Sequence, residues 1–203
     1  MDTLTPEIKL IIAGHAQHGK GTACAYLHDR FGLICRSSSH FAVFSLELFD
    51  DIASELSPGI PLTAARLAFY DNRGEHRALM YDRMHAYSKT TGFSGLATAM
   101  QADGISVYDG IRNDEEFEGS EHLFDAAIWI DASKRKPLES ESSISVTPSM
   151  CHYVVDNNGT SPAKMFDQLN EIILNIAAVK KLCEELQQRN LILHDLRLRG
   201  RHG

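Results

Sequence analysis

The order of hydrophobic and polar positions along the chain predicts strands that alternate with helices. Residues 8–13 form a short, continuous apolar run that ends at Gly14, a pattern typical of a strand buried on both faces. From 21 to 31 the apolar residues return at helical spacing. A strand, a glycine-containing turn and a helix therefore follow one another at the start of the chain.

The same reading extends to the rest of the sequence. Short apolar runs bounded by turn residues predict further strands at 33–36, 105–108, 126–130 and 151–155. Helical or amphipathic spacing is present at 41–56, 62–69, 75–87, 94–102, 113–122 and from 161 to about 188. This alternation indicates an α/β fold, a three-layer α/β/α sandwich around a five-stranded parallel sheet, in one domain over 1–203.

Two regions depart from the regular alternation. A mostly helical segment at about 41–103 separates the second and third predicted strands. Between the fourth and fifth strands, residues 131–149 read DASKRKPLESESSISVTPS, which is too polar for a core. We expect the part at about 132–149 to form a mobile loop or lid.

Composition limits the class of protein. Of the 203 residues 43% are hydrophobic, enough for a sizeable core, and no apolar run reaches the length of a membrane span or signal peptide. The four cysteines form no CxxC pair, so we expect reduced thiols and a cytoplasmic protein without a membrane partner. A net charge of −7 disfavours a DNA-binding module, although DNA stays open as a substrate and LRLRGRHG makes the C-terminus locally basic.

The first turn contains the most specific motif of the chain. Gly14 to Lys20 fits GxxxxGK, with Thr22 two places after the lysine. Glycines let backbone N–H groups curl around phosphate oxygens, the following helix offers its positive end, and Lys20 would reach the β- and γ-phosphates. The alternative interpretation is a glycine-rich turn with a chance lysine. Gly21 stands where many such loops carry Ser or Thr, and Thr22 would contact the α-phosphate.

The remaining positions of this loop are less informative. His15, Gln17 and His18 fill its variable positions, where their backbone amides would also face phosphate, and the histidines need no catalytic role. Asn157 and Asn158 leave the last strand in DNNGT. They would lie at the same edge of the sheet and read the donor base, or else form only a turn and a helix cap.

A second group of candidates follows the third strand. Asp109 comes at its carboxyl end, the edge at which open α/β sheets bind ligands. Its carboxylate would hold Mg²⁺ or its waters, or position an acceptor oxygen, and Arg112 would neutralise a transferring phosphate. The alternative is that Asp109 only caps the next helix.

A third group lies in the helical segment, in YDNRGEHRALMYD. Arg73 and Arg77 are four residues apart and would share a helical face, near His76 and Tyr81. Two aligned guanidinium groups can hold the phosphate of an acceptor. A solvated face with ion pairs to nearby carboxylates, at Asp71, Glu75 and Asp82, is equally compatible with the spacing. In the lid, Arg135 is the candidate that would close over the phosphates.

These motifs together resemble the phage-type deoxynucleoside monophosphate kinases of the P-loop kinase superfamily. The likeness rests on GHAQHGKGT, NRGEHRALMYD, YDGIRNDEEFE and MCHYVVDNNGT, between about Ile8 and Leu174. It implies ATP as donor, Mg²⁺, an acceptor-binding helical insertion and a small lid. The residues that would then bind donor phosphates are Gly14, Gly19, Lys20, Gly21 and Thr22. The resemblance places Arg73 and Arg77 at the acceptor, Asp109 and Arg112 at the reaction centre, and Arg135 in the lid. The loop lacks the family's proline, and the lid has one arginine.

Three functions fit these residues. The first is ATP-dependent phosphoryl transfer to a deoxynucleoside 5′-monophosphate, in the host cytoplasm if a phage encodes the protein. Another is a kinase of 5-hydroxymethyluracil within phage DNA, which would use the same phosphate machinery. The third is a nucleotide-binding regulatory protein without transfer activity. We expect the C-terminal helix at about 161–189 to serve for packing or as a homodimer surface, with a disordered basic tail.

Overall fold

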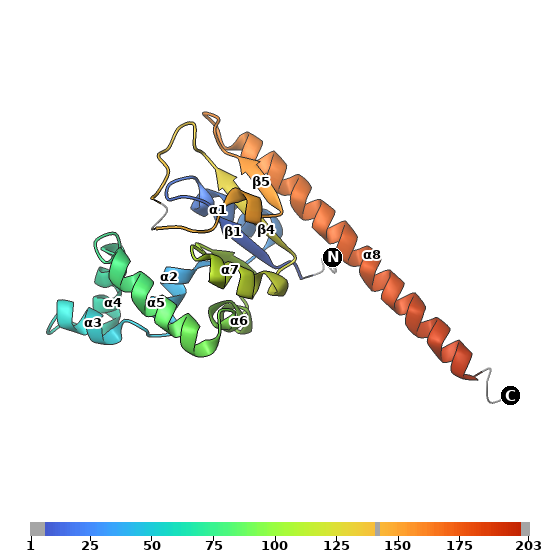
Figure 1. Ribbon diagram of the computed structural model, residues 1–203. Coiled ribbons are helices and arrows are strands. Elements are labelled where there is room, and N and C mark those ends of the chain that lie inside the picture. The colour runs from blue at the N-terminus through green and yellow to red at the C-terminus, as the bar shows by residue number, and fades with distance from the viewer. Residues whose placement is uncertain (1–6, 141–142, 200–203) are drawn as a thin grey trace.

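The computed structural model describes residues 7–140 and 143–199, without the side chains of 190–199. Its centre is a parallel sheet of five strands in the order β2-β3-β1-β4-β5 (Figure 1). The strands are β1 (Leu10–Ala13), β2 (Cys35–Ser37), β3 (Val107–Asp109), β4 (Ala126–Asp131) and β5 (Tyr153–Asp156). The predicted α/β class and five-stranded parallel sheet are thus confirmed. Three strands begin two residues later than predicted, at 35, 107 and 153.

Helices cover both faces of this sheet because its central strands are apolar on both sides. All four residues of β1 are buried. Leu10 and Ile12 pack into a core formed with α1 (Lys20–Phe31) and α8 (Ala163–Arg199). Ile11 and Ala13 face the opposite core, formed with α6 (Gly95–Ala102) and α7 (Asp114–Ser120). The continuous apolar run of the sequence therefore reflects burial on two faces.

The segment between β2 and β3 is helical, with α2 (Ser38–Phe44), α3 (Asp50–Leu56), α4 (Leu62–Asp71) and α5 (Arg77–Thr91) ahead of α6. One predicted segment here was wrong, since 41–56 is two helices and not one. Glu47 adopts a left-handed φ of 56° between them. The turn lets Phe41 and Phe49 both be buried, Phe49 in a separate small core with Phe69.

Helix α8 runs along one side of the sheet and then projects away from it (Figure 1). No glycine or proline interrupts 163–199, and the helix continues to Arg199. The start of the basic tail is therefore helical and not disordered, while 200–203 lie outside the described residues. Residues 181–189 are all exposed, including Leu182 and Leu186. None of the helices in the described part of the chain combines the length and the hydropathy that a membrane span needs.

Beneath α7, a buried tyrosine and a carboxyl group form a pH-sensitive pair. The hydroxyl of Tyr108 donates to Glu116, and burial raises the pKa of Glu116 to about 7 from an ordinary value of 4.5. Between these two values the unfolded chain releases a proton that the folded chain keeps. The folded state therefore loses stability as the pH rises through this window.

We expect Glu116→Gln to remove this loss, because glutamine still accepts from Tyr108 and carries no charge. From pH 5 to pH 8, the unsubstituted protein should lose on the order of 2 kcal/mol more unfolding free energy than the variant does. Urea unfolding at both pH values measures it. Glu118→Gln, on the exposed side of the same helix, is the control and should keep the original pH dependence. Equal pH dependence in Glu116→Gln and the unsubstituted protein would contradict the assignment.

Candidate functional site

The loop between β1 and α1, residues 14–19, is shaped to present backbone N–H groups. Gly14, Gln17 and Gly19 have positive φ values of 139°, 61° and 104°. Left-handed residues between right-handed ones turn successive amides toward one side and create an anion-binding concavity. A Cβ on Gly14 would lie 2.6 Å from the backbone oxygen of Ile130, and one on Gly19 would lie 2.2 Å from the side-chain nitrogen of Asn157. Contact with backbone therefore requires glycine at position 14, and the positive φ of 104° favours glycine at position 19.

Lys20 is the first residue of α1 and folds back over this glycine loop. Its Nζ donates to the carbonyl oxygens of Gly14 at 2.9 Å and His15 at 3.0 Å. Burial lowers the pKa of Lys20, while the nearby charge of Asp109 opposes that decrease. The ammonium group is thus held at the mouth of the loop, beside the end of β3.

Asp109 ends β3, beside Ile12 of β1 in the sheet register. Its Oδ1 atom is buried and has no hydrogen-bond partner among the described residues. Burial raises the pKa of Asp109, and the charges of Lys20 and Arg112 partly offset the increase. The helix cap is Asn113, whose side chain accepts from Glu116 N–H, so the interpretation of Asp109 as a cap is wrong.

The pair Arg73 and Arg77 does not share a helical face as predicted. Residues 72–76 are a turn, and α5 begins only at Arg77. Arg73 instead lies over the ring of Tyr70, 4.3 Å from its centroid, and donates to the Tyr70 carbonyl oxygen. Neither arginine forms an ion pair with Asp71, Glu75 or Asp82 within the described part of the chain. The Arg77 guanidinium points toward the sheet edge, where it meets Glu139 at 2.9 Å.

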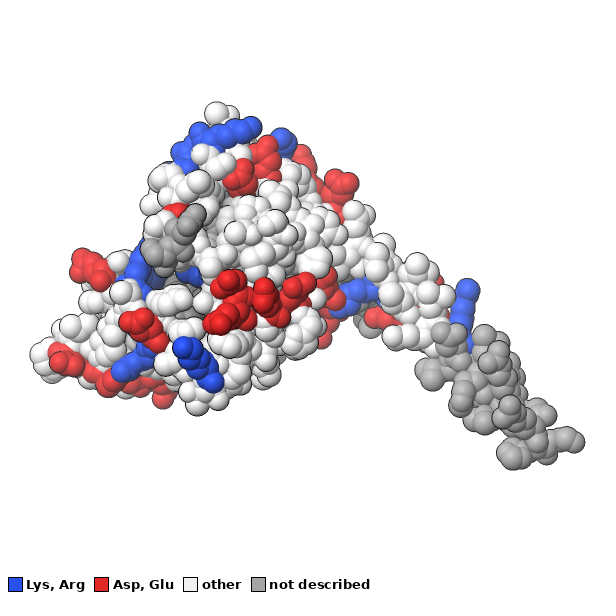
Figure 2. All heavy atoms as spheres, in the orientation of Figure 1, with Lys and Arg blue, Asp and Glu red and all other residues white. Residues whose placement is uncertain are grey.

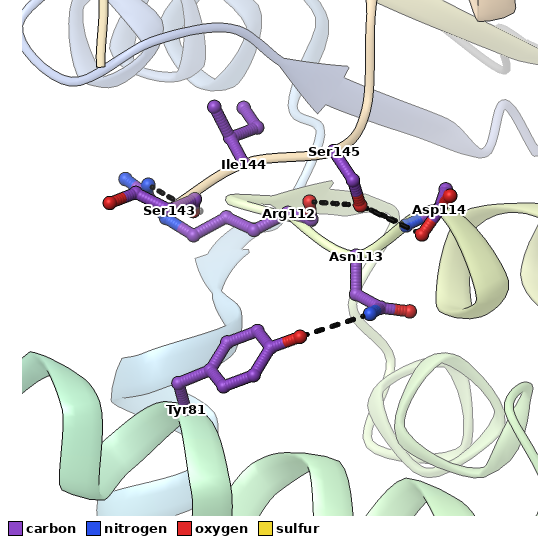
Figure 3. Close-up of a pocket in the computed structure, with 7 residues that line it drawn as sticks. All are labelled: Tyr81, Arg112, Asn113, Asp114, Ser143, Ile144 and Ser145. Atoms are coloured by element: carbon purple, nitrogen blue, oxygen red, sulfur yellow. Dashed lines mark hydrogen bonds between the residues drawn. The ribbon is translucent and has the colours of Figure 1, made fainter. Parts of the chain in front are cut away.

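A cavity of about 290 Å³ opens between α5, the start of α7 and the segment 143–145 (Figure 3). Tyr81 projects from α5 into it, and its hydroxyl accepts from Asn113 at 3.2 Å. Arg112 crosses the opposite side. The other predicted residue of this region, His76, stacks on Phe69 at 5.1 Å and so belongs to the packing of α4.

A second cavity, of about 230 Å³, lies at the ends of β2 and β3. Its lining residues are Cys24, Cys35, Arg36, Ser37, His40, Tyr70 and Asp109. Two of them present buried atoms without a partner among the described residues, the Nδ1 of His40 and the Oδ1 of Asp109. Burial lowers the pKa of His40, and the charge of Arg36 lowers it further. The cavity therefore offers two unfilled positions for hydrogen bonding.

Sequence patterns alone do not distinguish His40, Arg36 or Tyr70 as residues of this cavity. The available signal was the polar SSSH directly after the second strand, because the carboxyl ends of parallel strands meet at one edge. Tyr70 had no such signal, since it reaches the edge only through the packing of α4 against α2.

The asparagines after β5 support the glycine loop from behind. Asn157 is 5% exposed, and its side-chain nitrogen donates to the carbonyl oxygen of His18 at 2.7 Å. Asn158 bonds Asp131 and the backbone of Lys134. The lid residue Arg135 donates to the carbonyl oxygen of Asn157 at 2.5 Å. These three residues thus join the glycine loop to the start of the segment that follows β4.

Basic and acidic side chains gather on different sides of the site. Figure 2 shows basic side chains over the loop after β4, at the top of the view, and an acidic band over α7. The first turn of α7 contains Asp114, Glu115 and Glu116. Among the described residues, no group of three or more His, Cys, Asp or Glu side chains could hold a metal ion.

Comparison with known proteins adds no family assignment. No model of a known family matches the chain, and no curated protein sequence matches it. Among solved structures it is similar to TT1252 from Thermus thermophilus, with a TM-score of 0.49 and 16% identity over 83% of this chain and 96% of that one. It is also similar to an unliganded sugar kinase from Janibacter sp. HTCC2649, with a TM-score of 0.44 and 14% identity over 85% and 96%. The fold assignment therefore rests on the sheet itself.

Proposed function

We propose that this protein is an ATP-dependent kinase that transfers the γ-phosphoryl group to a deoxynucleoside 5′-monophosphate. The observation that supports it most is the convergence of Lys20, Asp109 and Arg112 at one edge of the sheet, close enough that neighbouring charges shift the pKa values of Lys20 and Asp109. Lys20 directly follows the glycine loop, while Arg112 and Asp109 each line one of the two cavities.

In this proposal the glycine loop and Lys20 bind the donor phosphates. The ammonium of Lys20 exchanges its two carbonyl partners for phosphate oxygens, which are stronger acceptors. Arg112 and Arg77 neutralise charge that spreads over the transferred group. Asp109, whose carboxyl group is close to the charges of Lys20 and Arg112, would hold Mg²⁺ or its waters beside the phosphates. Transfer needs positioning and charge neutralisation, and no covalent intermediate on the protein.

The residues present fit a magnesium ion that arrives with the nucleotide. Mg²⁺ keeps several waters and is often held by one or two carboxylates together with substrate phosphates, so a dedicated cluster of protein ligands is not required. The buried, unpartnered Oδ1 of Asp109 supplies such a carboxylate, and the exposed Thr22 supplies a hydroxyl at the start of α1. When bound, the ion would supply positive charge that offsets the charge of the phosphates.

The acceptor nucleoside is proposed to enter the cavity beside His40, where the Nδ1 of His40, which has no hydrogen-bond partner among the described residues, would meet its polar groups. The acidic band over α7 favours a free nucleotide over DNA. A duplex or single strand that approached Arg112 would bring many phosphates near the carboxylates of Asp114 and Glu115 in the first turn of α7, whereas a monophosphate brings one.

One panel of transfer reactions tests the proposal. The protein is incubated with γ-labelled ATP and Mg²⁺, and each reaction contains one acceptor from four classes: deoxynucleoside monophosphates, their ribo forms, hydroxymethylated monophosphates, and an oligonucleotide with 5-hydroxymethyluracil. We expect label on at least one free deoxynucleoside monophosphate. Label on the oligonucleotide alone would replace the proposal with the DNA kinase. Binding of ATP without label on any acceptor would favour the regulatory protein.

A further inference from the structure

The first part of the lid lies directly against the glycine loop, and two histidines hold it there. We call residues 132–139 the strap. His18 is fully buried, accepts from Ala132 N–H at its Nδ1 and lies 3.3 Å from the Pro137 carbonyl oxygen at its Nε2. His15 accepts from Glu139 N–H at 3.2 Å. Both histidines of the loop therefore bind the backbone of the strap.

These contacts bring the carboxylate of Glu139 to the mouth of the loop. Its Oε2 accepts from the backbone N–H of Ala16 at 2.5 Å, and its Oε1 accepts from Arg112 at 2.8 Å and Arg77 at 2.9 Å. The side chain is 12% exposed. A loop amide and two guanidinium groups are the kinds of donor that a phosphate group would engage.

The protonation state of Glu139 agrees with that placement. Burial alone would raise the pKa of Glu139, but the hydrogen bond and charge of Arg112, together with Ala16 N–H and Arg77, lower it overall. The side chain is therefore an anion at neutral pH. An anion in this position repels a second anion and blocks its access to the same donors.

We propose that Glu139 is an internal competitor of the donor nucleotide, occupying the anion position of the glycine loop until a triphosphate displaces the strap. This inference rests on the proposed function. Displacement would release Arg77 and Arg112 together, so both arginines become available for the transferred group only once the donor is bound. Glu139 would thereby keep weakly binding anions out of the glycine loop. The two arginines would join the site only when ATP is present.

The test compares the affinity of the unsubstituted protein for a non-hydrolysable ATP analogue with that of Glu139→Gln, by titration calorimetry with Mg²⁺. Glutamine is nearly the same size but has no charge, so its hold on the two arginines is weaker. We expect Glu139→Gln to bind the analogue about tenfold more tightly. Glu118→Gln removes the same charge from the exposed face of α7, and its affinity should stay within twofold of the unsubstituted protein.

A second measurement uses the intrinsic fluorescence of the protein. Trp129 is the single tryptophan, and its ring meets edge-on, at 5.3 Å, the ring of His15, which accepts from Glu139 N–H in the strap. We expect its fluorescence to change when the analogue displaces the strap. Nucleotide-free Glu139→Gln should already be shifted toward the bound value.

The outcomes separate the two proposals. If the unsubstituted protein and Glu139→Gln both fail to bind the analogue, the proposed function fails. If both bind it and the variant is equal or weaker, Glu139 is a structural or positioning residue and the inference is overturned. Binding without any change in Trp129 emission would also overturn the inference, while the proposed function would stand.

Discussion

Replacement of Lys20 by alanine is expected to lower the rate of phosphoryl transfer at least about 100-fold, the usual effect of removing one preorganised donor to a developing negative charge. The ammonium of Lys20 is held at the loop by two carbonyl oxygens, so little reorganisation is needed when phosphate arrives. Without the positive charge of Lys20 beside it, Asp109 should also have a still higher pKa.

The fold should tolerate this change. The Nζ of Lys20 donates to two carbonyl oxygens of the loop, and burial already disfavours its charged form. Initial rates measured with the best acceptor of the panel, together with urea unfolding, separate loss of transfer from loss of structure. Lys181→Ala removes an exposed lysine on α8 and serves as the control. Turnover of Lys20→Ala within threefold of the unsubstituted protein would contradict the role given to this residue.

The positions of Lys20, Asp109 and Arg112 could be predicted because each follows from local sequence and one topological rule. A continuous apolar run such as 8–13 indicates a strand buried on both faces, and parallel strands end at a common edge. The glycine that follows β1 and the aspartate that ends β3 must then be neighbours. The register pairs Ile12 with Asp109, in agreement with this expectation.

The residues that sequence patterns missed depend on long-range packing. His18 appeared to fill a variable loop position, yet it is fully buried because a strap more than a hundred residues away folds over it. Glu139 lies in a polar stretch without periodicity, so nothing local distinguishes it from its neighbours. The break between α2 and α3 likewise follows from the burial of Phe49, which helix propensity does not encode.

The turn at 72–76 shows how a correct residue type can be placed in the wrong geometry. The spacing of Arg73 and Arg77 suits a helix, but Asn72 and Gly74 interrupt it, and only Arg77 reaches the sheet edge. An asparagine and a glycine within three residues favour a turn over a helical interior. That local signal outweighs the spacing of the two arginines.

Gly14→Ala should produce the largest loss of stability among substitutions in the loop. Its φ of 139° is a conformation that side chains with a Cβ rarely adopt, and the added carbon would lie 2.6 Å from the backbone oxygen of Ile130. Neither β1 nor β4 can yield, because both are central strands of the sheet. We expect a loss of about 3 kcal/mol or more of unfolding free energy, from backbone strain and displacement together.

Gly21→Ala is the matched control in the same motif. No atom lies within 4 Å of the position its Cβ would take, and Gly21 has a helical backbone in the first turn of α1. Alanine should therefore be neutral or stabilise the protein by about 0.5–1 kcal/mol. Urea unfolding of both variants, followed by circular dichroism, measures the difference. An ordinary surface substitution changes the unfolding free energy by up to about 0.5 kcal/mol. If the unfolding free energies of Gly14→Ala and Gly21→Ala differed by no more than this, the close contact between the loop and β4 would not explain the glycine at position 14.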